Sequence, residues 1–183
     1  MKQLKILWIT GCIVLLDQIS KWIIKSTMSL HESISVLGDF FRITYIENPG
    51  MAFGIRFGDN IFFTVFALAA SVVILVYLFK MKGEHIFARI AMASILGGAI
   101  GNLTDRIIRG KVVDFLDFEF FDIEIPSFHF IFVDFPGYSL TRWPIFNVAD
   151  IAVTVGMIIL FIFVLFEPEG KNTGEEKNTT LIQ

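Results

Sequence analysis

The side chains best suited to chemistry in this sequence are two aspartates in apolar surroundings, Asp114 and Asp150. Taken singly, Asp114 could be a loop residue and Asp150 a charge at a helix N-terminus. Taken together they could meet, and two carboxyls in contact do not both ionise easily, so they share a proton. The ionised carboxyl could then take a proton from water while the protonated one donates to a carbonyl group. The pair therefore indicates acid–base hydrolysis.

Long apolar segments must position these aspartates. The chain of 183 residues is 55% hydrophobic and only 18% charged, with a mean hydropathy of +0.69. About 20 apolar residues are needed to cross a bilayer, and segments 6–24, 61–79, 86–108 and 151–166 approach that length, the last extending back to 145. We expect an all-α membrane protein, one domain over 1–183, with four transmembrane helices and a disordered polar tail at 167–183.

Polar residues gather at one end of three of these segments. They are Asp17, Lys21, Asn102, Asp105, Arg106, Asn147 and Asp150. Charged groups within a membrane are costly and usually mark an ion pathway or an active site. A proton-coupled transporter and a non-catalytic scaffold therefore remain alternatives to an enzyme.

The segments that follow the first and third helices on this side have a strand pattern. Residues 33–37, 41–46, 117–120, 122–125 and 128–135 predict a small β-sheet on the membrane surface, with its aromatic face toward the lipid. Tyr138 and Trp143 suit the membrane interface, and residues 48–50 (Asn-Pro-Gly) predict a turn.

Several polar residues also have a structural interpretation. Asp17 and Lys21 are spaced i, i+4, so they could form an ion pair that only supports the fold, or one that positions a neighbouring active-site loop. Asp105 could pair with Arg106 or Lys111, and Arg106 could instead bind a phosphate or a backbone carbonyl. The small residues between 97 and 101 predict close helix packing.

Other chemistries fit the sequence poorly. The single cysteine, Cys12, cannot form a disulfide within the chain, and the three histidines are scattered without an HExxH motif, so we expect no metal site. Ser20 and Lys21 are adjacent on a helix and point about 100° apart, which disfavours a Ser/Lys dyad. The small net charge of -3 lacks a basic cluster, so no nucleic-acid partner is expected.

Five sequence blocks, at 17–21, 48–54, 97–106, 112–115 and 146–150, resemble in order the signature blocks of bacterial lipoprotein signal peptidase, also called signal peptidase II. The resemblance implies that Asp114 and Asp150 are a catalytic aspartyl dyad. It also implies substrate-binding or supporting roles for Asn48, Gly50, Asn102, Arg106, Asn147, Asp17, Lys21 and Asp105.

The resemblance further implies a substrate, a diacylglyceryl prolipoprotein cut just before its lipidated lipobox cysteine, and no cofactor. It implies a multi-pass protein of the bacterial inner membrane with both termini cytoplasmic and the site near the extracytoplasmic face. We expect a monomer in the lipid bilayer. One departure from the family is that residues of about 117–143 look like an extracytoplasmic insertion that leaves both aspartate blocks intact.

Overall fold

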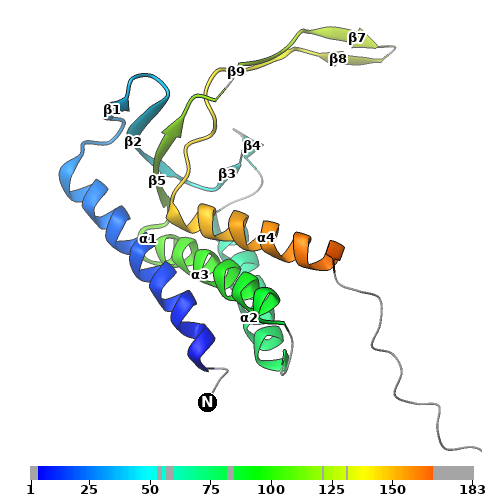
Figure 1. Cartoon of the computed structure of the whole chain (residues 1–183). Coiled ribbons are helices and arrows are strands. Elements are labelled where there is room, and N and C mark those ends of the chain that lie inside the picture. The colour runs from blue at the N-terminus through cyan, green and yellow to red at the C-terminus, as the bar shows by residue number, and fades with distance from the viewer. Residues whose placement is uncertain are drawn as a thin grey trace, which may run out of the picture.

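The computed structural model describes residues 4–52, 55–56, 60–81, 85–120, 122–130 and 132–166. After a short 3-10 helix, η1 (Leu4–Ile6), the four long helices are α1 (Leu7–Thr27), α2 (Asn60–Lys80), α3 (Ile86–Arg109) and α4 (Val148–Phe166). In the described part of the chain these four are long and apolar enough to cross a membrane. The helices pack side by side, and the strands lie at the end where α1 and α3 finish and α4 begins (Figure 1). The predicted fold class is therefore confirmed.

Helix α3 lies at the centre of the bundle and packs against α1, α2 and α4. Its glycines allow this close approach, because a Cβ on Gly97 would lie 2.9 Å from the Cβ of Ile13 in α1. A Cβ on Gly98 would overlap the carbonyl oxygen of Ala149 in α4. Gly156 of α4 packs back against α3 in the same way. The prediction of close packing by small residues is confirmed.

A three-stranded antiparallel sheet connects the helices at this end. Its strands β1 (Ser33–Leu37), β2 (Phe41–Asn48) and β5 (Val112–Phe118) lie in the order β1-β2-β5. Gly110, with φ +74°, ends α3 in the left-handed conformation that glycine adopts easily, and the chain enters β5 two residues later. Asp114 consequently lies inside a strand, and the interpretation of this residue as part of a loop is wrong.

The predicted small sheet is present, but the predicted strands at 122–125 and 128–135 do not join it. Strands β3 (Met51–Ala52) and β4 (Ile55–Arg56) pair with each other. Strands β6 (Ile123–Ile125) and β9 (Tyr138–Leu140) form a second pair, and β7 (Phe128–Phe130) and β8 (Val133–Phe135) form a third. We refer to residues 119–142 as the arm, which projects away from the helices (Figure 1). Pro126 and Pro136 separate its two pairs, because proline cannot donate to a strand ladder.

Helix α4 begins at Val148, so its predicted extension back to 145 is wrong. The preceding Phe146 is bonded to β5, since its N–H donates to the carbonyl of Leu116 at 3.1 Å and its carbonyl accepts from Leu116 at 2.8 Å. Those bonds cannot coexist with a helical conformation. They place Asn147 and the first turn of α4 beside β5. The predicted tail at 167–183 and the end of the 48–54 block lie outside the described residues.

The close packing of α3 against α4 can be tested by adding a methyl group at Gly98. We expect Gly98→Ala to destabilise the protein by about 1–3 kcal/mol, because its methyl group would meet the Ala149 carbonyl rather than a mobile side chain. Gly11→Ala in α1 is the matched control, since a Cβ there has nothing within 4 Å, and it should be neutral or stabilising by up to about 1 kcal/mol. Thermal unfolding in detergent measures both. Equal effects of the two substitutions would contradict the proposed packing.

Candidate active site

One asparagine holds both predicted catalytic aspartates. The buried Asn147 donates from Nδ2 to Asp114 Oδ1 at 2.6 Å, and its backbone N–H donates to Asp150 Oδ2 at 3.1 Å. The backbone N–H of Asp150 donates in return to Asn147 Oδ1 at 3.1 Å. This reciprocal pair is a capping box at the start of α4. The residue that begins the helix therefore also fixes the strand carboxyl of Asp114 beside it.

Two further asparagines complete the hydrogen bonding of the pair. Asn102 of α3 donates from Nδ2 to Asp150 Oδ1 at 2.8 Å. Asn48, at the end of β2, donates from Nδ2 to Asp114 Oδ2 at 3.2 Å. Each carboxyl thus accepts two N–H groups, which come from Asn48, Asn102 and Asn147.

Gly50 shapes the turn that presents Asn48. Its backbone N–H donates to Asn48 Oδ1 at 2.9 Å, which leaves the Asn48 amide nitrogen directed to Asp114. Gly50 has φ +108°, and a Cβ on it would lie 2.8 Å from the ring of Phe63. Both observations require glycine at this position.

Burial changes the acidity of the strand aspartate. Asp114 is only 3% exposed, and burial, together with the smaller effect of the neighbouring Asp150, raises its pKa to about 7. The hydrogen bonds from Asn147 and Asn48 oppose this rise. A proton is therefore available in this pair near neutral pH, which an ordinary aspartate with a pKa of about 3.9 would not hold.

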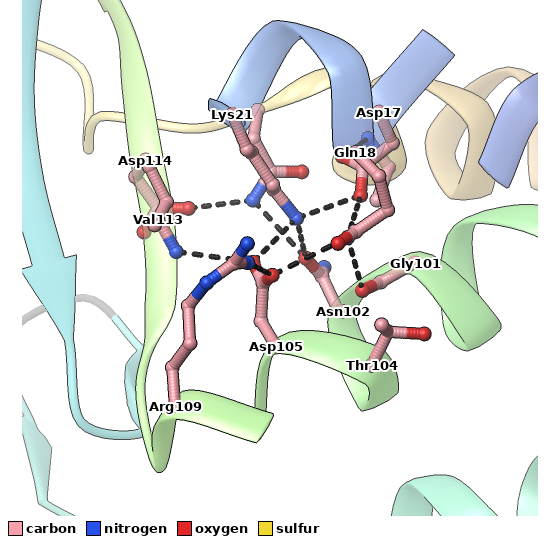
Figure 2. A network of polar contacts seen from close by, with 12 residues as sticks. Asp17, Gln18, Lys21, Gly101, Asn102, Thr104, Asp105, Arg109, Val113 and Asp114 are labelled. Atoms are coloured by element: carbon pink, nitrogen blue, oxygen red, sulfur yellow. Dashed lines mark hydrogen bonds and ion pairs between the residues drawn. The ribbon is translucent and has the colours of Figure 1, made fainter. Parts of the chain in front are cut away.

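Beneath the pair lies a buried lysine with three acceptors. Lys21 of α1 is fully buried, and its Nζ lies 2.9 Å from each of Asp17 Oδ2, Asp105 Oδ2 and Asn102 Oδ1 (Figure 2). An ammonium has three N–H donors, so each of them has a partner. The predicted Asp17–Lys21 ion pair is confirmed.

Asp17 connects this lysine to the start of α4. Its Oδ1 accepts the backbone N–H of Ala149 at 3.0 Å, in the first turn of the helix that carries Asp150. A carboxylate is stabilised there by the helix dipole. A Cβ on Gly101 would lie 2.6 Å from Asp17 Oδ2, so the absence of a side chain at this position leaves room for the carboxylate.

Asp105 makes the corresponding connection to β5. Its Oδ2 accepts the backbone N–H of Val113 at 3.2 Å, next to Asp114, and its Oδ1 pairs with Arg109 (Figure 2). The prediction that Asp105 pairs with Arg106 or Lys111 is wrong. Arg109 lies one helical turn from Asp105 and faces the same side, whereas Arg106 follows it directly and faces another. Lys111 instead lies 3.5 Å from Glu47.

Arg106 lies near the aspartates without forming an ion pair with either in the part of the chain that the structure describes. Its Nη1 donates to the backbone carbonyl of Asn102 at 3.4 Å, which confirms the carbonyl contact among its predicted roles. Its charge attracts Asp150 and Asp114. Its Nε is buried and has no hydrogen-bond partner among the described residues. Arg106 therefore has a donor left for a bound molecule.

Sequence reasoning missed two residues of this network, Gln18 and Arg109. Gln18 Nε2 lies 3.1 Å from Asp17 Oδ2 and 3.3 Å from Asp105 Oδ1, so it bridges the two carboxylates that share Lys21. The i, i+4 spacing of Asp105 and Arg109 was the signal for the second of them. The described residues contain no group of three or more His, Cys, Asp or Glu that could hold a metal ion.

Together these features define a multi-pass membrane protein with a hydrogen-bonded carboxyl pair at one end of its helix bundle. Residues 9–166 match the family model of signal peptidase (SPase) II. The lipoprotein signal peptidase of Syntrophus aciditrophicus is 38% identical over 167 residues, covering 88% of this chain and 92% of that protein. The lipoprotein signal peptidase of Bacillus pumilus is 40% identical over 162 residues, with coverage of 88% and 92%.

Solved structures agree with the sequence comparisons. The structure of a bacterial membrane enzyme matches with a TM-score of 0.73 at 30% identity and covers 94% of both chains. A second such structure matches with a TM-score of 0.71. This chain belongs to the signal peptidase II family and is a protease, so the transporter and scaffold alternatives no longer apply.

The buried lysine makes the fold sensitive to one substitution. We expect Lys21→Met to cost about 3–5 kcal/mol, because it leaves Asp17 and Asp105 as buried charges without their shared cation. Lys25→Met, which removes a partly exposed pair with Glu47 at 3.2 Å, should cost about 0–1 kcal/mol. Unfolding in detergent distinguishes the two, and a Lys21 variant as stable as the Lys25 variant would show that the buried cluster does not stabilise the fold.

Proposed function

We propose that Asp114 and Asp150 are the catalytic dyad with which this protein removes signal peptides from prolipoproteins. The observation that carries the proposal is the placement of both carboxyls, from a strand and from a helix, on one buried asparagine at the end of the bundle. Asp17 and Asp105 also share hydrogen-bonding residues, but both of these carboxylates are paired with the ammonium of Lys21.

The environments of the two aspartates favour different roles. Asp114, whose pKa is raised to about 7, is the acid that donates its proton to the scissile carbonyl oxygen. Asp150 accepts two N–H groups in the first turn of α4, where a carboxylate is favoured, and is the base that takes a proton from the attacking water. Water oxygen bonds to the carbonyl carbon and forms a tetrahedral intermediate. The proton held by Asp150 then passes to the leaving amine as the peptide bond breaks, and Asp114 regains its own.

The position of the site fits a substrate anchored in the bilayer. The signal peptide can lie among lipid-facing helices, and the diacylglyceryl group on the lipobox cysteine can stay in the lipid while the bond before that cysteine reaches the dyad. Arg106, whose charge acts on both carboxyls, would orient the scissile bond by binding a carbonyl of the extended peptide. The dyad and its asparagines come from one chain, which is consistent with a monomer and a single domain.

The arrangement of the four helices also supports a particular orientation of the chain in the membrane. Four crossings bring Leu7 and Phe166 to one side of the membrane, and the dyad lies at the opposite ends of α1 and α3. We propose that the side of the dyad is extracytoplasmic, in the bacterial cytoplasmic membrane, with both described ends on the cytoplasmic side. Substrates translocated across this membrane would then present their cleavage site where the dyad lies.

Substitution of either aspartate tests the dyad. Asp114→Asn and Asp150→Asn should each lower cleavage of a diacylglyceryl prolipoprotein by at least about 10²–10⁴-fold, because each removes a proton-transfer group. The purified full chain is assayed in detergent, with thermal unfolding measured in parallel. Asp134→Asn, at an exposed position in the arm, is the matched control and should cleave like the parent. Near-parental cleavage by either dyad variant would exclude that aspartate from catalysis.

The acidity of Asp114 predicts a pH dependence. Because the acid must be protonated, cleavage should decline as the pH rises through about 7. Asn48→Ala removes a hydrogen bond that lowers the pKa of Asp114, so this alkaline limb should move to higher pH even if the maximal rate falls. A pH–rate profile of kcat/KM for both proteins provides the measurement. A limb that stays fixed or moves to lower pH would contradict the assignment of Asp114 as the acid.

A further inference from the structure

The arm has one apolar face and one polar face along each of its strand pairs. In the β6–β9 pair, Ile125 lies opposite Tyr138 on one face, and Glu124 lies opposite Ser139 on the other. In the β7–β8 pair, Phe128 lies opposite Phe135 with ring centroids 5.0 Å apart. His129 and Asp134 pair on the opposite face. The arm is therefore amphipathic without covering its apolar face itself.

The apolar residues near the tip are strongly exposed. The exposed fraction is 53% for Phe128, 66% for Phe130 and 94% for Phe132. A two-stranded hairpin is at best marginally stable in water without something to pack against. Contiguous exposed aromatic side chains usually mark a binding surface. The arm therefore needs a partner for this face.

The base of the arm is fixed to the sheet that carries Asp114. Arg142 donates from Nε to Asp117 Oδ1 at 2.8 Å and from Nη1 to Glu119 Oε2 at 2.5 Å. These bonds join the last residue of the arm to its first residue and to β5. Asp117 lies in β5 and also accepts from Thr44 of β2 at 2.6 Å. The arm therefore starts at the end of the bundle where the three-stranded sheet lies, and folded structure fixes its base (Figure 1).

Aromatic residues continue from the sheet into the arm. Phe118 of β5 stacks on Phe120 with centroids 5.3 Å apart, and Phe120 contacts Trp143 edge to face at 6.3 Å. Phe120 and Trp143 are both exposed, and tryptophan is enriched where protein meets the lipid headgroups. This continuity favours the bilayer itself, rather than a second copy or a soluble protein, as the partner of the apolar face.

We propose that the arm lies on the membrane on the side of the dyad and inserts Phe128, Phe130 and Phe132 into the lipid interface. Burial of apolar side chains, not attraction between charges, drives this entry into the lipid. Residues 119–142 contain four Asp and Glu against one Arg, so anionic headgroups do not attract the arm. Anchored at both its base and its tip, the arm holds β5 at a fixed height above the lipid. This proposal does not depend on the identity of the catalytic residues.

An environment-sensitive fluorophore at the tip tests the insertion. In a full-length Cys12→Ser background, Phe130→Cys is labelled with a nitrobenzoxadiazole dye and the protein is reconstituted into phosphatidylcholine vesicles that contain doxyl-labelled lipid. Ser139→Cys, on the polar face of the same arm, is the matched control. We expect doxyl lipid to quench the dye at 130 several-fold more strongly than the dye at 139, and aqueous iodide to quench the dye at 139 more strongly than the dye at 130. Adding phosphatidylglycerol to the vesicles should not increase the quenching by doxyl lipid. Phe128→Cys should behave as Phe130→Cys does.

Three results would overturn the proposal. Equal iodide quenching at 130 and 139 would place the arm in water. Protection of 130 from both quenchers, with energy transfer between labelled copies, would show that a second chain covers the apolar face. Quenching by doxyl lipid that appears only with phosphatidylglycerol would make the contact electrostatic. The readout does not require peptide cleavage, so an error in the proposed catalytic function would not alter it.

Discussion

The position of the proposed active site depends on one buried cation, the ammonium of Lys21. It binds two carboxylates, and each of these accepts a backbone N–H next to one member of the proposed dyad. Asp17 accepts the N–H of Ala149, and Asp105 accepts the N–H of Val113. Burial of a lysine is costly unless each N–H has an acceptor and the charge is compensated, and here both conditions are met. Lys21 therefore links helix α4 and strand β5, which belong to distant parts of the chain, in addition to the direct bonds of Phe146 with Leu116 and of Asn147 with Asp114.

This electrostatic arrangement requires unusually close packing. Asp17 reaches the first turn of α4 only because Gly101 leaves its position free, and α4 lies against α3 only because Gly98 has no side chain to meet the Ala149 carbonyl. In a membrane, close approach of helices provides much of the association energy, since lipid gives no hydrophobic drive between them. The same glycines thus serve two purposes: they allow the helices to pack, and they bring a carboxylate to a helix N-terminus.

The sequence predicted what depends on local pattern and not what depends on pairing between distant segments. The lengths of the apolar segments predicted the four membrane-spanning helices, and the clustering of polar residues at one end of these helices indicated the candidate site. The start of α4 was missed because Phe146 is taken out of the helix by Leu116, thirty residues earlier in the chain. The partner of Asp105 was wrong because contact on a helix follows its turns, so Arg109 and not the adjacent Arg106 faces the carboxylate. Within the arm, the predicted strands form two separate pairs because two prolines interrupt the ladder between them.

Hydrogen bonding alone does not separate the two aspartates, because each accepts two N–H groups from the asparagines around them. The difference comes from the backbone that carries each. Asp150 occupies the first turn of a helix, whose aligned peptide dipoles favour a negative charge. Asp114 lies in a strand, where neighbouring dipoles largely cancel, so it has no helix dipole beside it. Placing one carboxyl on each kind of element, joined by Asn147, gives two identical groups different surroundings, as the proposed division into acid and base requires.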